Sequence, residues 1–411
     1  MLTDIRSQTA EELEIQFRDW GQPTYRAKQL LEWLYVQRAT SWDDMRNLPA
    51  ALRSRLREEY SLSALELIRP QGSPDTTRKF LWRLDDRSLI ESVLIPASPA
   101  LYGDPSDRHT LCISTQVGCA YGCKFCASGL AGWKRNLRVE EIVNQVLAVE
   151  RWHLARGEGD SPESAVHSPQ STVLSQQSTV HGPQAAGDSR EAGGVVPDHA
   201  SRITHHAPTR LISNLVIMGM GEPLANYDNL LKALRILNAP WGGGIGARKI
   251  TISTSGLAPQ IGRLAGEPLQ FRLAISLHGA TDAVRNKIMP VNRKHPLAEL
   301  IAACEYYQKS RGRMITFEYI LISGINDGLD QVKPLAALAR RLNARVNLIP
   351  YNVVEGLPWV RPAEPVQEAF LRALEKEKVA ATLRREKGHD IDAACGQLRL
   401  KTERELANLP S

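Results

Sequence analysis

Hydrophobic positions over residues 211–350 follow two alternating patterns. Short runs of aliphatic and β-branched residues, typical of buried strands, are separated by segments in which apolar residues recur every three or four positions. The strand-like runs are 215–218, 249–253, 273–277, 316–321 and 346–349, and helices are expected between them, for example at 226–238 and 331–343. Repeated strand–helix units of this length predict a parallel sheet with right-handed crossovers, of about six strands when one strand before Cys119 is included.

The helix expected before this array runs into a segment of different composition. An apolar stripe at helical spacing predicts a helix packed on the sheet; it comprises Val139, Ile142, Val143, Val146 and Leu147. Residues 155–210 then contain no aromatic residue and no cysteine, and are rich in Ser, Gly, Pro, Gln and Ala. Such a composition buries too little apolar surface to offset the entropy of ordering, so a disordered insert is predicted. Its five histidines, including His205 and His206, leave a metal-binding tract as the alternative to a solvated linker.

Upstream, residues 1–62 predict a small helical module. Two helices are indicated by apolar residues at helical spacing, with Ala27, Leu30, Leu31 and Leu34 in the first and Leu52 and Leu56 in the second. The first 60 residues hold nine basic and ten acidic side chains. Bulk charge therefore does not identify the module as an RNA binder, and a role in packing alone stays open.

Residues 63–105 predict a β-hairpin connector that leads into the core. Polar and apolar residues alternate over 79–84 and 92–96, on either side of a turn at Asp85 and Asp86. Glu91 lies at the start of the second strand. Taken alone, it reads as a solvated carboxylate.

Composition and charge limit the class of protein. A chain of 411 residues with 43% hydrophobic content can bury a sizeable core in one large domain with appendages, or in two to three domains. No apolar run approaches the roughly 18–20 residues of a membrane span, and residues 1–20 do not resemble a signal peptide. A cytoplasmic location is expected. The net charge of +6 and pI of 9.0 only mildly favour a polyanionic partner such as RNA.

Three of the six cysteines, Cys119, Cys123 and Cys126, fall at C-x3-C-x2-C spacing. Thiolates suit iron–sulfur clusters or zinc, and both usually take four protein ligands. Three close cysteines without a fourth indicate a [4Fe-4S] cluster with one iron open to a small molecule. The alternatives are a zinc site completed by Cys112 or a distant histidine, and buried free thiols. Cys304, in an apolar helical run, is expected in the core, and this cysteine usage fits a reducing compartment.

The same motif, with an aromatic residue before its last cysteine, resembles the signature of the radical S-adenosylmethionine (radical SAM) enzymes. Two longer strings, TLCISTQVGC at 110–119 and DIDAACGQL at 390–398, resemble the RlmN/Cfr branch, which methylates adenine in ribosomal RNA. The resemblance covers nearly the whole chain except the insert. It implies a partial (β/α)6 radical SAM barrel at 106–400, a C-terminal tail at 401–411 and an RNA-binding role for residues 1–62. It also implies one [4Fe-4S] cluster and two molecules of SAM per turnover.

The strand ends supply the cofactor-binding residues that this resemblance implies. A turn after the second strand, Gly219-Met220-Gly221-Glu222-Pro223, could bring backbone close to a ligand and a carboxylate close to a charged amine. Alone, it could equally be a simple tight turn. In the resembling family, Gly221 and Glu222 hold the amino group of SAM, and further contacts are implied at Ser253, Ser276, Leu277, His278 and Asn352. Taken singly, His278 would more often be a structural histidine.

The resemblance also implies a route through two distant cysteines. Cys395 is methylated by one SAM, and a 5′-deoxyadenosyl radical from a second SAM removes hydrogen from that methyl group. The resulting radical adds to adenine, whose carbon between two ring nitrogens is too electron-poor to attack a methyl cation donor. Glu91 then removes a proton, and Cys112 attacks Cys395 to release the product through a Cys112–Cys395 disulfide.

Carbon 2 of an adenosine in 23S rRNA, and possibly in tRNA, is the favoured target, and a Cfr-type methylation at carbon 8 is the alternative. A flavodoxin or ferredoxin is expected as electron donor, and the chain is expected to be a monomer with no membrane partner. Arg384, Arg385 and Lys387 could contact phosphate or form a solvated charge run. The alternative from another functional class is a zinc-stabilised RNA-binding protein without catalytic activity. A radical enzyme acting on protein or small molecules would use neither the N-terminal module nor the cysteine pair.

Overall fold

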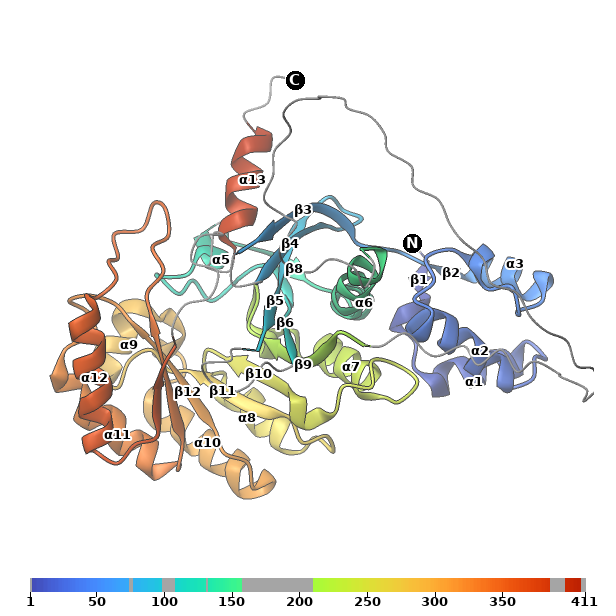
Figure 1. Ribbon diagram of the computed structural model, residues 1–411. Coiled ribbons are helices and arrows are strands. Elements are labelled where there is room, and N and C mark those ends of the chain that lie inside the picture. The colour runs from blue at the N-terminus through green and yellow to red at the C-terminus, as the bar shows by residue number, and fades with distance from the viewer. Residues whose placement is uncertain are drawn as a thin grey trace, which may run out of the picture.

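One long sheet organises the molecule (Figure 1). The computed structural model describes residues 2–73, 77–97, 108–130, 132–156, 210–384 and 396–407. Within these ranges ten strands pair in the order β14-β13-β12-β11-β10-β9-β6-β5-β4-β3. Their bounds are β3 Glu66–Gly72, β4 Arg78–Arg83, β5 Leu89–Pro96, β6 His109–Cys112, β9 Ile212–Ile217, β10 Ile250–Thr254, β11 Arg272–Ser276, β12 Thr316–Leu321, β13 Arg345–Pro350 and β14 Ala381–Leu383.

In this sheet β6 and the six strands from β9 to β14 run parallel, as the alternating pattern predicts. Each predicted run coincides with a strand, and β12 has the predicted bounds of 316–321. The connecting helices are α6 Val139–Ala155, α7 Tyr227–Asn238, α8 Ala258–Ala265, α9 Asp282–Ile288, α10 Leu297–Arg311, α11 Val332–Arg341 and α12 Glu364–Lys376. The predicted α/β fold is therefore confirmed. The short strand β14 extends the sheet beyond the predicted strands.

The core lies between the helices and the sheet. Phe317, Tyr319 and Leu321 on β12 are buried, and so is Cys304 on α10, as expected. The apolar stripe of α6 is buried as well. No helix in the described part of the chain is long and apolar enough to cross a membrane.

The connector continues the core sheet. β4 and β5 form the predicted hairpin, β3 adds a third antiparallel strand, and β5 pairs antiparallel with β6 at the edge of the parallel region. The helix α13, Gln397–Ala407, stands beside this connector (Figure 1). Its Leu398 forms a small apolar cluster with Leu81 and Leu89. The helix runs through residue 400, where the sequence placed the start of a tail.

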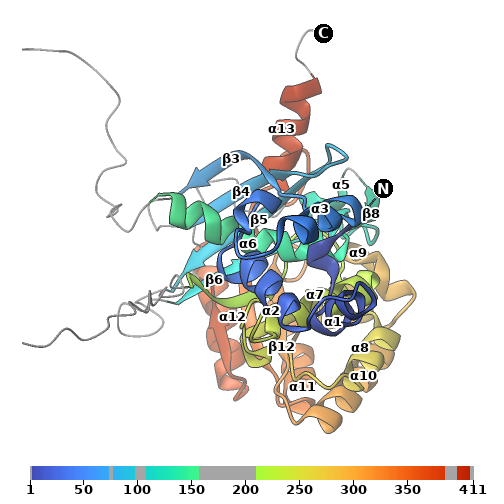
Figure 2. The ribbon, with the colours of Figure 1, turned by 90° about the vertical axis from the view of Figure 1, so that its right-hand side faces the viewer.

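The N-terminal module lies against one side of the core, next to α6 and α7 (Figures 1 and 2). It contains α1 Ala10–Asp19, α2 Tyr25–Leu31, a π-helical turn at Glu32–Val36 and α3 Ala50–Glu59. A two-stranded pair, β1 Thr3–Asp4 with β2 Tyr60–Ser61, closes it. The helix α1 was not predicted, although a capping box formed by Thr9 and Glu12 marks its start.

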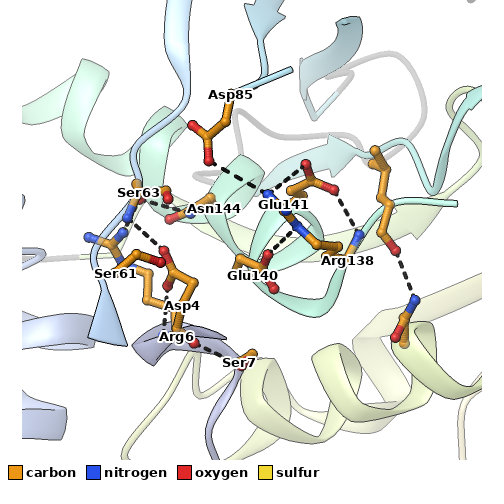
Figure 3. A network of polar contacts seen from close by, with 12 residues as sticks. Asp4, Arg6, Ser7, Ser61, Ser63, Asp85, Arg138, Glu140, Glu141 and Asn144 are labelled. Atoms are coloured by element: carbon orange, nitrogen blue, oxygen red, sulfur yellow. Dashed lines mark hydrogen bonds and ion pairs between the residues drawn. The ribbon is translucent and has the colours of Figure 1, made fainter. Parts of the chain in front are cut away.

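A buried polar network joins the module to α6 (Figure 3). The two carboxylate oxygens of Asp4 accept hydrogen bonds from the backbone N–H groups of Arg6, at 2.9 Å, and Ser63, at 2.6 Å. The Arg6 guanidinium donates to the carbonyls of Ser63 and Ala39. From α6, Asn144 donates to the same Ser63 carbonyl at 3.2 Å. These hydrogen bonds cross the junction and fix the module on the core, although Arg6 Nε and Asn144 Oδ1 have no partner among the described residues.

A second link is a buried ion pair between Arg38 of the module and Glu150 of α6, at 3.1 Å. Glu150 also accepts hydrogen bonds from the backbone N–H groups of Leu211, at 3.2 Å, and Ile212, at 3.0 Å. One carboxylate therefore ties together the module, α6 and the start of β9. The predicted insert at 155–210 lies almost entirely outside the described residues.

Candidate active site

A cavity of about 280 Å³ opens at the carboxyl ends of the parallel strands. Active sites of βα barrels lie at this end, because each strand delivers its following loop there. The cavity brings together most of the predicted site residues: Cys119, Cys123, Cys126, Gly221, Glu222, Ser253, Ser276 and His278. Leu277 and Asn352 do not line it. Leu277 is buried with its N–H bonded to the carbonyl of Glu318, and Asn352 is half-buried just after β13.

The three cysteine side chains share one wall of this cavity. Burial raises the pKa of Cys119 to about 11, and it raises the pKa of Cys123 as well. A buried thiol with a high pKa forms a thiolate only when a bound metal supplies positive charge. The site therefore stabilises thiolates together with cationic iron, and not thiolates alone. These soft donors fit a [4Fe-4S] cluster.

Among the described residues, no three His, Cys, Asp or Glu side chains converge on one point as they would around a single metal ion. A cube-type cluster makes a different demand, because each thiolate binds its own iron atom. The ring of Phe125, within the same loop, contacts His278 edge-on at 5.0 Å between centroids. The cysteine loop is thereby packed directly against the end of β11.

The turn after β9 requires glycine at two positions. A Cβ on Gly219 would lie 2.6 Å from the backbone of Ile113. Gly221 has φ of +101°, and its Cβ would lie 2.5 Å from the side chain of Gln116. Only glycine permits this conformation and this approach. The turn therefore lies directly on the loop that follows β6.

Glu222 ends this turn as a fixed, buried carboxylate. One oxygen accepts from the backbone N–H of Ser255 at 2.7 Å, and the other from that of Leu224 at 3.1 Å. Burial raises the pKa of Glu222, while the bonds from Ser255 oppose that shift. A carboxylate held this way at a cavity wall can receive a cationic amine, which would replace the lost hydration.

Ser253 and Ser276 place two hydroxyl groups side by side on neighbouring strands, with 3.3 Å between their oxygens. His278 follows, with φ of +52°. Burial, with the nearby Arg285 cation, lowers the pKa of His278 to about 3. Its Nδ1 accepts from the N–H of Ile320 at 3.1 Å, so the neutral ring carries its proton on Nε2. His278 is thus both a structural histidine and a neutral donor at the cavity.

Arg285 of α9, which the sequence did not reveal, holds these strand ends together. Its fully buried guanidinium donates to the carbonyls of Ser255, at 3.0 Å, Ser276, at 3.2 Å, and Leu277, and to the side chain of Asn292 at 2.8 Å. Burial lowers its pKa to about 10, so it stays charged at neutral pH. A single arginine within a helix carries no sequence signal for this role.

Glu91 is not solvated, as it would be expected to be if it were taken alone, and its role as the base stays a prediction. Its side chain is 2% exposed and forms an ion pair with Lys79 at 3.2 Å. Its oxygens accept from the backbone N–H groups of Gly396, at 2.8 Å, and Arg399, at 2.7 Å. Glu91 therefore binds the amino end of α13, where free N–H groups and the helix dipole favour an anion.

Of the two cysteines of the expected methyl-transfer route, only Cys112 lies in the described part of the chain. Cys112 is buried on β6, opposite Val93 of β5. Cys395 lies outside the described residues, as do Arg385 and Lys387, and no disulfide joins the described cysteines. Gly396, the next residue after Cys395, packs so closely on Ser128 that a Cβ would lie 2.8 Å from its hydroxyl oxygen.

Four residues that line the cavity were missed or weighed differently in the sequence. Ser128, just after the cysteine loop, and Tyr121, within it, carried no motif. Glu318 stands in a strand-like run and was read only as part of that strand. Arg384, expected to contact phosphate or solvent, reaches the cavity wall.

Comparisons with protein families and with solved structures both identify similar RNA or radical SAM methyltransferases. Residues 3–62 match the ribosomal RNA large subunit methyltransferase N-terminal domain, and residues 192–335 match the radical SAM superfamily. A crystal structure of a radical SAM methyltransferase from Sphaerobacter thermophilus has a TM-score of 0.78 and 38% identity, covering 96% of this chain and 98% of that one.

Two curated relatives are named probable dual-specificity RNA methyltransferases of the RlmN type. The protein from Opitutus terrae is 50% identical, over 98% of this chain and 95% of its own length. The protein from Akkermansia muciniphila is 46% identical, over 99% and 98%. Together with the matching fold and the cysteine-lined cavity, these similarities show that the chain belongs to the RlmN family of radical SAM RNA methyltransferases.

Proposed function

We propose that this protein methylates carbon 2 of a specific adenosine in 23S rRNA, and of an adenosine in tRNA. The curated relatives are named dual-specificity RNA methyltransferases, and membership of the radical SAM family implies a [4Fe-4S] cluster and SAM. We place the protein in the cytoplasm as a monomer, supplied with electrons by a flavodoxin or ferredoxin. The basic pI of 9.0 is compatible with an RNA substrate.

Different residues of the cavity would bind the cluster and SAM. Cys119, Cys123 and Cys126 would each hold one iron, and Glu222 would accept the amino group of SAM. When bound and reduced, the cluster with SAM supplies a 5′-deoxyadenosyl radical. Ser253, Ser276 and the neutral His278 would orient the nucleoside part, and Leu277 and Asn352 remain expected contacts although they do not line the cavity.

The remaining steps use side chains of the protein. Cys395 takes a methyl group from one molecule of SAM, which leaves as S-adenosylhomocysteine. That methyl group then loses a hydrogen atom to the 5′-deoxyadenosyl radical, and its carbon joins adenine; the cluster would take one electron back from this adduct. Glu91 accepts the proton that leaves the adenine carbon. Cys112 attacks the sulfur of Cys395, which forms a disulfide and breaks the bond between that sulfur and the added carbon. The carbon keeps the electron pair and takes up a proton to become the methyl group of the product. Two molecules of SAM are consumed per turnover, and the disulfide must be reduced before the next turnover.

The observation that carries this proposal is the position of Gly396. Its N–H bonds to Glu91, and its Cα packs on Ser128, which lines the cavity two residues after Cys126. The residue that follows Cys395 thus joins the expected base to the cysteine loop. Cys112 is on the adjacent strand, paired with Val93, two residues from Glu91.

Glu91 would need one change before it acts. Glu91 pairs with Lys79 and accepts hydrogen bonds from two backbone N–H groups, and these contacts fix its position. Both oxygens are occupied by α13, so the first turn of α13 has to release one of them to admit adenine. We expect the start of α13 to move when RNA binds.

The test is Cys112→Ala expressed in a strain that lacks its own enzyme of this family. The expected product is protein covalently attached to RNA through Cys395, because the thiol that resolves the adduct is missing. Cys304→Ala, which removes a buried thiol far along the chain, is the matched control and should carry no RNA. Free Cys112→Ala protein without adduct would contradict the proposal.

The position of methylation is tested separately. RNA from the same strain complemented with the wild-type gene is digested, and the methyladenosine isomer is identified by mass spectrometry in rRNA and tRNA fractions. We expect 2-methyladenosine in both. The 8-methyl isomer would instead assign a Cfr-type activity.

A further inference from the structure

Arg399 is a buried cation in the first turn of α13, and none of the steps above uses its side chain. That side chain is fully buried, and none of its three guanidinium nitrogens has a hydrogen-bond partner within the described ranges. An oxygen of Glu403, one turn further along α13, lies 3.7 Å from Nη1, which is too far for a hydrogen bond. A guanidinium carries five N–H donors. In this position they lose hydration and gain no acceptor, which is costly for a charged group.

A second buried polar group lies on the same face of α13. Thr402 follows Arg399 by three residues, and residues at this spacing are neighbours on the surface of a helix. Its side chain is buried, and its hydroxyl also lacks a hydrogen-bond partner in the described part of the chain. Buried groups of this kind normally find a carbonyl, a carboxylate or a water. One face of α13 therefore presents two donors whose acceptors the described residues do not supply.

The contacts that hold α13 in place are individually weak. Three solvent-accessible ion pairs link it to its neighbours: Arg69 with Glu405 at 2.8 Å, Lys134 with Glu403 at 3.5 Å and Arg404 with Glu355 at 3.3 Å. Such pairs contribute little to stability and are screened by salt. The docked position of α13 thus combines weak attachment with a buried cation that has no acceptor.

The missing partner of Arg399 is an anion with oxygen acceptors. Glu91 is already taken, because it pairs with Lys79 at 3.2 Å and accepts from the backbone N–H groups of Gly396 and Arg399. The planar fork of a guanidinium matches carboxylate and phosphate groups, which it binds through two parallel hydrogen bonds. RNA carries a phosphate at every nucleotide. Because Gly396 packs on Ser128 at the cavity wall, RNA that enters the cavity brings such acceptors to the start of α13.

We propose that Arg399 binds a backbone phosphate of the RNA substrate, and that this contact draws the first turn of α13 away from Glu91. The inference rests on the proposed function, in which α13 releases an oxygen of Glu91 to admit adenine. The backbone N–H of Arg399 is one of the two donors on that carboxylate. The residue that binds the phosphate is therefore the residue that uncovers the base. Its guanidinium breaks no hydrogen bond when it leaves the buried position.

The binding test uses the full chain with its cluster reconstituted and an unmodified transcript of 23S rRNA. Arg399→Met, which removes the charge at similar volume, should bind this RNA about tenfold more weakly than wild type. The slope of log affinity against log salt should become less steep by about 1, as expected for one lost phosphate contact. Arg399→Lys keeps the cation and should keep the slope. Arg372→Met, which removes an exposed arginine of α12 paired with Glu368, is the matched control and should behave as wild type does.

Two further readouts separate this role from a merely structural one. Arg399→Met should raise the urea midpoint, because a buried cation disappears and no hydrogen bond is lost with it. Hydrogen exchange follows the backbone N–H groups of Gly396 and Arg399, which Glu91 protects in the free protein. Adding the rRNA transcript should speed their exchange in wild type and not in Arg399→Met. Inorganic phosphate at the same ionic strength should leave it unchanged.

The outcomes distinguish this inference from the proposed function. Equal rRNA affinity and salt slope in wild type and Arg399→Met would overturn the role of Arg399 alone, and a lowered urea midpoint would show that the arginine is structural. Faster exchange with inorganic phosphate alone would assign the site to a free anion and overturn the RNA contact. A wild-type chain that does not bind the rRNA transcript would overturn both the inference and the proposed function.

Discussion

Two buried polar regions of this protein differ in how their carboxylates are paired. At the junction between the N-terminal module and α6, both oxygens of Asp4 and both oxygens of Glu150 accept hydrogen bonds from the protein itself. In the strand-end cavity, only Oε2 of Glu318 accepts a hydrogen bond from the described residues, and three thiols face the same space. The paired carboxylates hold the module on α6, although Arg6 Nε and Arg38 Nη1 beside them lack a partner within the described ranges. The cavity leaves the second oxygen of Glu318 and the thiols open to a ligand.

The largest expected effect comes from removing a proposed cluster ligand on the cavity side. Cys123→Ala should lose most of its bound iron and reduce methylation below detection, because two thiolates cannot retain the cube. The checks are iron content, visible absorbance and methylation of RNA. Denaturant unfolding of apoprotein should match wild type, since the junction is untouched. Full iron content in this variant would remove the cysteine loop from the cluster site.

On the junction side, Glu150→Ala should destabilise the protein by about 3–5 kcal/mol, because it leaves Arg38 buried without its partner. Urea unfolding measures the change. The double variant Arg38→Met/Glu150→Leu is the control, and it should lose less because no charge remains buried. Affinity for SAM should be unchanged in the surviving folded protein. A loss of affinity would mean that the two regions are not independent.

Arg285→Lys probes the support behind the cavity. A single ammonium group cannot reach three carbonyls and Asn292, so buried acceptors are left unpaired at a cost of about 2–3 kcal/mol. Unlike the junction variant, it should also weaken SAM binding, because the loops after β10 and β11 lose their common anchor. Unfolding and SAM titration check the two effects. Wild-type affinity would show that the strand ends hold their positions without Arg285.

The smallest effect concerns His278. Its pKa is lowered from 6.5 to about 3, so between these values the unfolded chain binds a proton that the folded chain does not. Stability should therefore fall as pH drops below 6.5, by about 2 kcal/mol at pH 5. His278→Asn, which tolerates the positive φ, should lose this part of the slope. Parallel stability curves for both proteins between pH 7 and 5 would contradict it.

The sequence predicted the elements of the sheet but not all of their partners. The run 316–321 is buried and bounded by turns, so it predicts β12 without knowledge of its neighbours. The pairing of β5 with β6 was not predictable, because strand order depends on contacts that no local pattern encodes. The cysteine loop could be predicted because it depends on local spacing: its three cysteines lie within eight residues of one another.

The positions that sequence reasoning missed act across long separations. Glu91 taken alone suggests a solvated carboxylate, and only the family resemblance indicated a role for it, since the N–H groups that bury it belong to residues 396 and 399. Glu318 carried a weak signal, as a carboxylate within an apolar strand that is buried on both sides. Such a residue either has a partner or receives a ligand. Arg285 had no comparable signal within its helix.

The contact between Glu150 and the first residues of β9 has a practical consequence. It joins the last turns of α6, five residues before the helix ends at Ala155, to the start of β9 at Ile212. When two anchor points are held together, halving or doubling the connecting length changes the closure free energy by only about 0.6 kcal/mol. Between these anchor points we therefore expect a change in chain length to alter the free energy of unfolding only slightly, which would allow the predicted insert to be shortened or to carry a fluorescent reporter.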